Sequence, residues 1–202
     1  MKKILLLIGF LLLTFCISVS AYAVSYTMDS LATGYYTEGD FSNMFVGVDF
    51  NNSGGAGFNI QAVTLDPDFS GNAVYNSPFN TTGNNTCATL LNATDFVSVT
   101  MGDYNADSDE LYLFAYNTSD ILLDSDHFSN PASSYAGTTL MVSSLFDDIA
   151  YVKFYGVGVD NNSVYWDNFS FNIPAEPVPE PASIFLLSTG LLGFLRFRNK
   201  SG

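Results

Sequence analysis

The chain has 202 residues, of which 48% are hydrophobic and only 13% charged, against roughly 25% charged in an average soluble domain. Acidic residues outnumber basic ones 20 to 6, which gives a formal net charge of −14. This composition excludes intrinsic disorder and a coiled coil, and the negative charge excludes nucleic-acid binding because phosphate backbones would be repelled.

Residues 1–23 have the pattern of a secretory signal peptide. Two lysines follow the initial methionine, an apolar run covers residues 4–15, and small residues end at Ala21 and Ala23. Cleavage after such an A-x-A site predicts a mature chain that starts at Val24. The alternative, a lipoprotein signal at the cysteine of this segment, is disfavoured because a phenylalanine precedes the cysteine where a small residue is needed.

The hydrophobic residues of the next part of the chain, residues 24–174, alternate with a period of two, which is typical of half-buried strands. Seven stretches show it: 44–50, 58–62, 96–101, 111–116, 139–143, 149–155 and 164–171. Clusters of Asn, Asp, Gly and Pro between these stretches are typical of turns. We therefore predict an all-β fold, a single β-sandwich of jelly-roll type with about eight strands, and one helical turn at 143–148.

The histidine and the cysteine of this domain offer little catalytic chemistry. His127 follows Asp124 and Asp126 and could act as a base or a metal ligand, but no nucleophile elbow or H-E-x-x-H motif accompanies it. Cys87 is expected in a polar, Asn- and Thr-rich loop without a neighbouring base that would lower the thiol pKa. We expect a surface histidine, a thiol without a catalytic role and no intramolecular disulfide.

Carboxylate pairs are a second source of chemistry, since a glycoside hydrolase needs two carboxylates about 5 to 9.5 Å apart. Asp124 with Asp126, and Asp147 with Asp148, are such pairs in the sequence. A chain this acidic supplies pairs by chance, so we predict no catalytic residues and no enzyme. A secreted carbohydrate-active enzyme, either a glycoside hydrolase or a lyase, is the alternative.

Aromatic side chains are candidates for sugar binding, because tyrosine and tryptophan combine an apolar ring with a polar group. Most aromatic residues of a β domain are needed in or beside the core. The sequence alone therefore designates no binding residue among the candidates, which are Tyr35, Tyr36, Tyr75, Tyr104, Tyr135 and Trp166.

Asp167 is the first candidate metal ligand. It has the same strand parity as Tyr165, Phe169 and Phe171, so we expect a partly buried carboxylate on an aromatic, core-directed face. A buried carboxylate needs a cation, hydrogen-bond donors or a proton, and Lys153 is the single base of residues 24–180. Because Ca²⁺ prefers oxygen ligands, we predict a structural calcium ion there. The alternative is a carboxylate that accepts bonds from backbone amides.

A second candidate calcium site is the acidic stretch 103–110. Asp103, Asp107 and Asp109 place oxygen ligands at every second or fourth position. The stretch is not an EF-hand, because Ser108 occupies the sixth position, where that loop needs glycine. The alternative interpretation is a solvated acidic turn.

The C-terminal part of the chain consists of a Pro- and Glu-rich spacer, residues 175–181, and an apolar segment with a basic end, residues 182–202. Fourteen uncharged residues as a helix cover roughly 21 Å, less than a hydrocarbon core of about 30 Å. The terminal cations, Arg196 and Arg198 among them, predict a cytoplasmic C-terminus and a domain on the other side of the inner membrane.

Pro179, Glu180 and Pro181, followed by the short apolar helix and the basic end, resemble the PEP-CTERM sorting signal. This resemblance implies a Gram-negative bacterium that makes exopolysaccharide, and an exosortase that removes the tail. With signal peptidase as the other processing partner, we expect a non-enzymatic protein that is secreted or held at the cell surface or in the matrix, with a structural, adhesive or glycan-binding role.

The domain itself resembles jelly rolls of galactose-binding type over roughly residues 28–173. The stretches that carry the resemblance are 97–103, 107–116 and 164–171, the last with Asp167 and Asn168 between aromatic residues. The resemblance implies a β-sandwich, carbohydrate binding and a structural calcium ion near the last strand.

Processing at both ends can be tested by mass spectrometry of the protein isolated from its own host. We expect a chain that starts at Val24 and lacks the segment from Arg196 to Gly202, since an exosortase removes the basic tail. A mature protein that retains the basic tail would contradict the exosortase interpretation. Simple membrane anchoring would then be the remaining interpretation.

Overall fold

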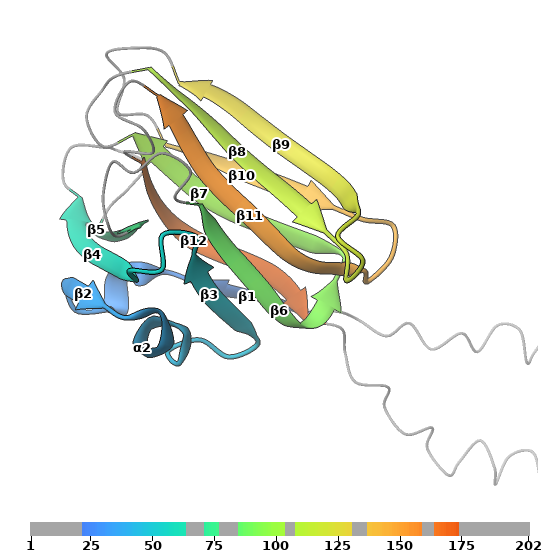
Figure 1. The fold of residues 1–202 in the computed structure, drawn as a ribbon, viewed down its shortest axis with the longest axis horizontal. Helices are drawn as coiled ribbons and strands as arrows, with labels where there is room; N and C mark the ends of the chain where they lie inside the picture. Colours follow the sequence, from blue (N-terminus) through green and yellow to red (C-terminus); the bar gives the residue numbers. More distant parts are fainter. Residues whose placement is uncertain are drawn as a thin grey trace, which may run out of the picture. The chain divides into compact units, whose positions relative to one another are not determined.

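A computed structural model describes six stretches of the chain, in which two antiparallel sheets pack face to face (Figure 1). The described residues are 22–63, 71–76, 85–103, 108–130, 137–158 and 164–173. They belong to one structural unit, Ala21–Pro174. The rest of the signal peptide, the spacer and the apolar tail lie outside the described residues. Among those residues, no helix is long and apolar enough to cross a membrane.

The larger sheet has seven strands. Its order is β10 (Thr138–Ser143), β7 (Phe96–Asp103), β12 (Val164–Ile173), β5 (Gly71–Asn76), β4 (Phe58–Val63) and β2 (Gly34–Tyr36), and β1 (Tyr22–Tyr26) also pairs with β12. The last strand of the domain therefore lies inside this sheet, between β7 on one side and β5 and β1 on the other.

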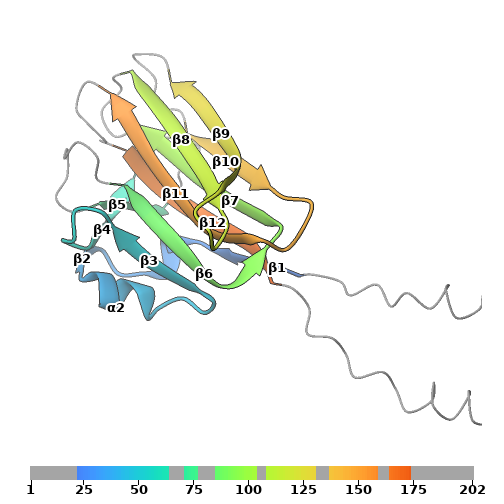
Figure 2. The same ribbon diagram turned by 45° about the vertical axis from the view of Figure 1, so that its right-hand side comes forward.

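The smaller sheet has five strands and lies in front of the larger one in Figures 1 and 2. Its order is β3 (Val48–Asn52), β6 (Thr86–Thr94), β11 (Ile149–Gly158), β8 (Asp109–Tyr116) and β9 (Leu122–Asn130). A 3-10 turn, η1 (Met28–Ser30), and a short helix, α2 (Glu38–Ser42), connect the first strands. The prediction of an all-β sandwich is confirmed, with twelve strands in the described residues where about eight were expected.

Aromatic side chains from both sheets meet in the core. Trp166 of β12 is 2% exposed, stacks on Phe50 of β3 at 5.2 Å between ring centroids, and meets Phe154 of β11 edge-on at 5.2 Å. Phe41 of α2 and Phe58 of β4 complete the group. Each such side chain contributes about 1.5–3 kcal/mol through burial, so this cluster holds the two sheets together.

Two local predictions are wrong. The stretch 44–50 is a strand only from Val48 on, and Val46 is 78% exposed in the preceding turn. The stretch 143–148 is a bend in which Leu145 is 94% exposed, rather than a helical turn. The α-helix in the described residues is α2, whose cap Thr37 accepts a bond from the N–H of Asp40 through its hydroxyl. Five residues are too few to display a helical hydrophobic period.

The first and last strands of the domain are neighbours, with Tyr22 opposite Ile173 and Tyr26 opposite Phe169. Tyr26 packs edge-on against Phe45 and its hydroxyl donates to the carbonyl of Val46. Cleavage after Ala23 would remove two residues of β1 and leave the part of the strand that carries these contacts.

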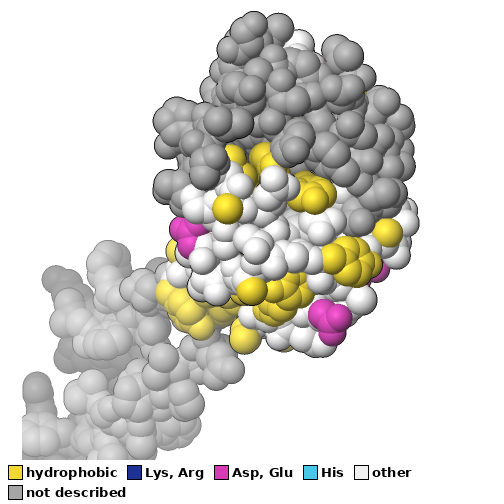
Figure 3. Space-filling view, turned by 90° about the vertical axis from the view of Figure 1, so that its left-hand side faces the viewer, with side chains coloured by type: hydrophobic (Ala, Val, Ile, Leu, Met, Phe, Trp, Pro, Cys, Tyr) yellow, Lys and Arg dark blue, Asp and Glu magenta, His cyan; other side chains and the backbone are white. Residues whose placement is uncertain are grey.

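The surface of the described domain is mostly uncharged. Figure 3 shows the side that carries β2 and β4, where single hydrophobic side chains are separated by polar atoms and a few acidic groups. No Lys, Arg or His is visible among the described atoms of this side. Scattered apolar side chains of this kind are normal for a soluble domain and do not mark a binding surface.

Two carboxylates join the edges of the sandwich, where β9 of one sheet lies beside β10 of the other. The N–H of Met141 donates to Asp126 Oδ2 at 2.9 Å, and the N–H of Ser143 donates to Asp124 Oδ2 at 2.8 Å. These carboxylates thus satisfy backbone donors that an edge strand otherwise exposes.

Removal of these carboxylates tests the role of the edge. We expect Asp124→Ala and Asp126→Ala each to lower the free energy of unfolding by about 1 kcal/mol in urea titrations, because each leaves a backbone donor without its acceptor. Asp49→Ala, an exposed aspartate of β3, is the control and should stay within about 0.5 kcal/mol of the wild type. Equal losses in all three variants would show that lost charge, and not the edge bonds, sets the stability.

Candidate functional site

The outer face of the five-stranded sheet carries a group of half-buried aromatic side chains, which we call the aromatic face. Tyr112, Phe114 and Tyr116 of β8 form it together with Tyr151 and Tyr155 of β11. In β8 these residues alternate with buried Leu111, Leu113 and Ala115. Because side chains of a strand alternate between its two faces, one row fills the core and the other points outward.

The pairing of β8 with β11 sets the arrangement of the rings. Tyr112 lies opposite Tyr155, and Tyr116 lies opposite Tyr151. The centroids of the first pair are 5.4 Å apart and those of the second pair 5.0 Å apart, with planes at 32° and 11°. Phe114 stacks on Tyr112 at 5.9 Å and on Tyr155 at 6.0 Å. The aromatic face thus has two ring groups, one of three rings and one of two.

Lys153 of β11 lies between these groups. It is directly opposite Phe114 of β8 on one side and Cys87 of β6 on the other. Its ammonium nitrogen is 5.5 Å from the ring centroids of both Tyr116 and Tyr151, within the range of a cation–π contact. The centre of the aromatic face is therefore positively charged.

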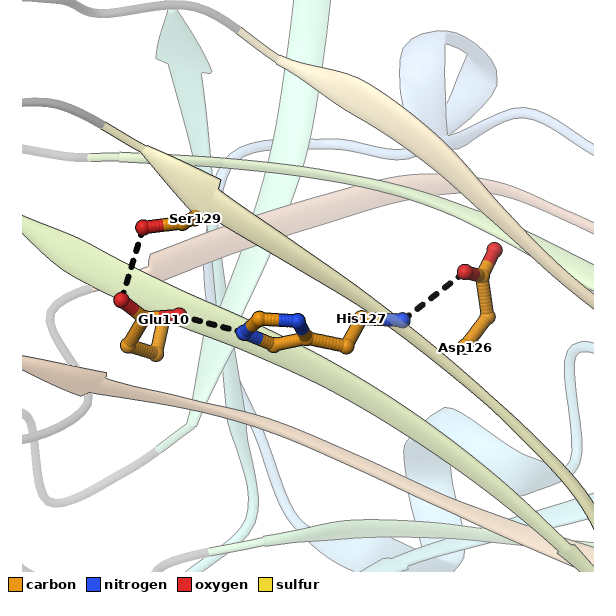
Figure 4. A network of polar contacts seen from close by, with 4 residues as sticks. All are labelled: Glu110, Asp126, His127 and Ser129. Atoms are coloured by element: carbon orange, nitrogen blue, oxygen red, sulfur yellow. Dashed lines mark hydrogen bonds and ion pairs between the residues drawn. The ribbon is translucent and has the colours of Figure 1, made fainter.

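His127 extends the aromatic face onto β9. Its ring stacks on Tyr112 at 4.8 Å, and its Nε2 contacts Glu110 Oε2, while Ser129 donates to Glu110 Oε1 at 2.7 Å (Figure 4). The bond from Ser129 and then the one with His127 lower the pKa of Glu110. Asp126 accepts from the backbone N–H groups of His127 and Met141, and its side chain lies on the other side of β9. The arrangement is that of a surface histidine, as expected.

The phenol groups of Tyr151 and Tyr155 are weaker acids than an ordinary tyrosine. Burial and a hydrogen bond to Asp120 Oδ1 raise the pKa of Tyr151 to about 12. Burial, followed by the nearby tyrosines, raises the pKa of Tyr155. Both hydroxyls therefore remain hydrogen-bond donors at any physiological pH.

Cys87 lies within β6, on the same outer face, and not in a loop as its polar neighbours in the sequence suggested. Burial raises the pKa of its thiol, and the hydroxyl of Thr89 and the charge of Lys153 offset only part of this effect. A thiol with a raised pKa is a poor nucleophile, and the expectation that the pKa of this thiol is not lowered agrees with the structure.

Asp167 is buried, as predicted, but its surroundings differ from the prediction. The strand has an irregularity at Asn168, which adopts a φ of 48°, so Asp167 does not share a face with Phe169 and Phe171. Trp166, expected to point away from the core, points into it. The N–H of Met28 in η1 donates to Asp167 Oδ1 at 2.8 Å. This is the alternative interpretation, in which backbone amides hold the carboxylate.

Burial raises the pKa of Asp167, and the N–H groups of Met28 and Asn168 offset part of that increase. The charge of Asp29 adds to it. The described residues contain no group of three or more His, Cys, Asp or Glu side chains that could hold a metal ion. A calcium ion at Asp167 stays a prediction.

The second predicted calcium site lies mostly outside the described residues. Asp107 is not described, and Asp103 is described only as the end of β7. Asp109, the first residue of β8, is fully buried. It lies opposite Gly158, where a Cβ would come within 1.8 Å of Asp109 Oδ1, so this glycine leaves room for the carboxylate. The calcium loop stays a prediction.

The aromatic candidates named from the sequence that lie in the described residues are engaged in other contacts. Trp166 is in the core, Tyr36 and Tyr35 donate to the carbonyls of Ala32 and Ala56, and Tyr75 packs on Tyr165. Tyr104 and Tyr135 lie outside the described residues. Sequence reasoning missed the aromatic face, and the alternate positions of Tyr112, Phe114 and Tyr116 in the strand are the signal that could have indicated it.

The two candidate carboxylate pairs lie at the edge of the sandwich and in a bend. Asp124 and Asp126 accept the backbone bonds from β10, so their oxygens are engaged at the edge of the sandwich. Asp147 and Asp148 lie in the bend before β11. Neither pair belongs to the aromatic face.

The ionisation of Asp167 gives a test of its surroundings. With a raised pKa in the folded state, its contribution to stability is complete below the ordinary carboxyl pKa and is lost as pH rises through the raised value. Asp167→Asn should therefore match or exceed the wild-type free energy of unfolding at about pH 7 and lose that advantage at about pH 3. Asp167→Ala should lose about 1–3 kcal/mol at both, because the Met28 N–H loses its acceptor.

Urea titrations at the two pH values check this, and equal losses for both variants at neutral pH would contradict it. Melting temperatures measured with Ca²⁺ and with excess chelator test the predicted calcium sites. The comparison of the wild type, Asp167→Asn and Asp107→Asn distinguishes the two sites. Coincident wild-type melting curves would end the calcium prediction.

Comparison with solved structures finds β-sandwich domains of low sequence identity. The CBM22-1 xylan-binding domain of Xyn10C from Paenibacillus barcinonensis has a TM-score of 0.42 and 8% identity, with 80% of this chain and 99% of that chain covered. The K1 cleaved adhesin domain of Lys-gingipain from Porphyromonas gingivalis has a TM-score of 0.46 and 11% identity, with 74% and 97% covered. At these TM-scores the likenesses carry no argument about the site.

A protein of the DUF4465 family from Bacteroides caccae is similar to the same degree, with a TM-score of 0.43, 11% identity, and 79% and 96% of the two chains covered. No curated protein matches the chain in sequence. The family model that matches describes the C-terminal end alone. The chain carries a PEP-CTERM protein-sorting motif at residues 177–200.

Proposed function

We propose that this protein is an exported, non-enzymatic glycan-binding protein whose aromatic face is the binding surface. The observation that carries the proposal is the gathering of five aromatic rings, a histidine and a lysine on the outer face of β8, β11 and β9.

The chemistry of the aromatic face suits a sugar. A sugar ring has apolar C–H groups and a rim of hydroxyls, and tyrosine offers both an apolar ring and a polar group. Stacked rings stand side by side on the sheet, so they present their edges and phenol groups outward. Because Tyr155 stays protonated, its hydroxyl can donate to an oxygen atom of a glycan, whereas the hydroxyl of Tyr151 already donates to Asp120.

The sorting motif supports a location where glycans are present. It indicates export toward the cell surface by an exosortase-type system. We further propose signal peptidase as the N-terminal processing partner, an inner-membrane intermediate in a Gram-negative cell, and the exopolysaccharide matrix as the place of action. In that setting, a structural or adhesive role follows from binding the matrix glycan.

The competing function is a carbohydrate-active enzyme. Its two carboxylates would have to lie beside the bound sugar, and the described acidic groups nearest the rings of the aromatic face include Glu110 and Asp120. Glu110 bonds to His127 and Ser129, and Asp120 accepts from Tyr151. These engagements favour binding over hydrolysis, and a zymogram with the same glycans tests the enzyme directly.

The binding surface can be tested with Tyr112→Leu and Tyr155→Leu, which keep apolar bulk and remove the ring and its hydroxyl. On a glycan array, and in affinity electrophoresis with the glycans that bind, each variant should weaken binding about 5- to 30-fold, as for central interface residues. Phe146→Leu, at a side chain that is 71% exposed away from the sheet, is the control and should bind like the wild type.

Melting curves of all three variants establish that they are folded. Unchanged binding by folded Tyr112→Leu and Tyr155→Leu would place the glycan site elsewhere. A wild-type protein that binds no glycan on the array would contradict the proposed function.

A further inference from the structure

Lys153 is an exceptional charge in this domain. Residues 24–180 contain 20 acidic residues and this single basic one, a formal charge of −19. With so many carboxylates available, a lysine that served only to neutralise charge would lie beside one of them. The one ion pair in the described part of the chain joins His127 to Glu110, and Lys153 takes no part in it.

Its contacts within the described residues are with aromatic rings instead. The ammonium lies 5.5 Å from the rings of Tyr116 and Tyr151, and the strand register places Lys153 between those rings and the Tyr112–Tyr155 pair. A bound glycan that covers both ring groups therefore passes over this ammonium. The position is at the middle of the proposed site, where partial burial strengthens a charged contact.

The negative charge of the domain does not prevent a local contact with an anion. At physiological ionic strength, charges separated by more than about 8 Å are largely screened. The titratable groups on and around this face are Glu110 and His127, which pair with each other, Asp120, which bonds to Tyr151, the exposed Asp49, and Cys87 with a raised pKa. Lys153 is thus the group on this face that can hold an anion.

We infer that the aromatic face binds an acidic glycan, and that Lys153 determines this specificity by pairing with an anionic substituent, a uronate carboxylate or a sulfate ester. The inference rests on the proposed function and adds the substrate class. Lys153 is a specificity residue in this assignment, and the aromatic rings supply the contacts that neutral and acidic glycans share.

Lys153→Met and Lys153→Arg test the assignment, because methionine keeps an apolar stem without charge and arginine keeps the charge. The wild-type domain should bind uronate-containing or sulfated glycans on an array more tightly than neutral ones. Affinity electrophoresis then compares the best acidic glycan with its carboxyl-reduced or desulfated form. Lys153→Met should weaken binding of the acidic form by about tenfold or more and abolish the preference for the acidic over the neutral form, and Lys153→Arg should retain the preference.

The outcomes separate this inference from the proposed function. Binding of neutral glycans alone, or an acidic-to-neutral preference that survives in folded Lys153→Met, overturns the inference and leaves the proposed function standing. A lower melting temperature of Lys153→Met with an unchanged preference shows that the lysine only covers the tyrosine rings, and it also overturns the inference. Absence of all glycan binding overturns both. The carboxyl-reduced and desulfated probes decide between uronate and sulfate.

Discussion

The packing of Trp166 against rings of the opposite sheet is the interaction on which the rest of the structure depends. Phe50 stacks on the indole and Phe154 meets it edge-on, both at 5.2 Å, so one side chain of β12 joins the seven-stranded sheet to two strands of the other. Cys87 is a free thiol, and the described residues contain no metal cluster. Apolar burial must therefore supply most of the free energy that holds the layers together.

The scarcity of cations determines how the acidic side chains are used. In the described residues, carboxylates accept from backbone N–H groups of other segments: Asp167 from Met28, Asp29 from Asn72, Glu38 from Asn52, and Asp124 and Asp126 from β10. Such bonds stabilise a carboxylate without an opposite charge. These bonds also anchor η1, α2 and the sheet edge. The acidic side chains therefore help to fix the connections of the sandwich.

The sequence predicted strands where apolar residues alternate, as in Leu111 to Tyr116, and failed where polar residues point inward. Strand β6 was missed because Thr86 and Thr94 are buried at positions where the pattern required apolar side chains, and Thr86 is satisfied by a bond to Asn76 Oδ1. The faces of β12 were misassigned because the positive φ of Asn168 shifts the parity in mid-strand. Hydrophobic period alone cannot reveal a tertiary hydrogen bond or a bulge.

The aromatic face could be predicted only in part, because strand pairing is not visible in the sequence of one strand. Parity predicts that Tyr112, Phe114 and Tyr116 point away from the core, but only the pairing of β8 with β11 places Tyr155, Lys153 and Tyr151 opposite them. The inward row of β8 packs in the core, while the outward row meets solvent and its cross-strand partners. Because successive residues face opposite sides of the sheet, the outer row can change its chemistry with little effect on the core. This separation lets one strand pair support both the sandwich and a binding surface.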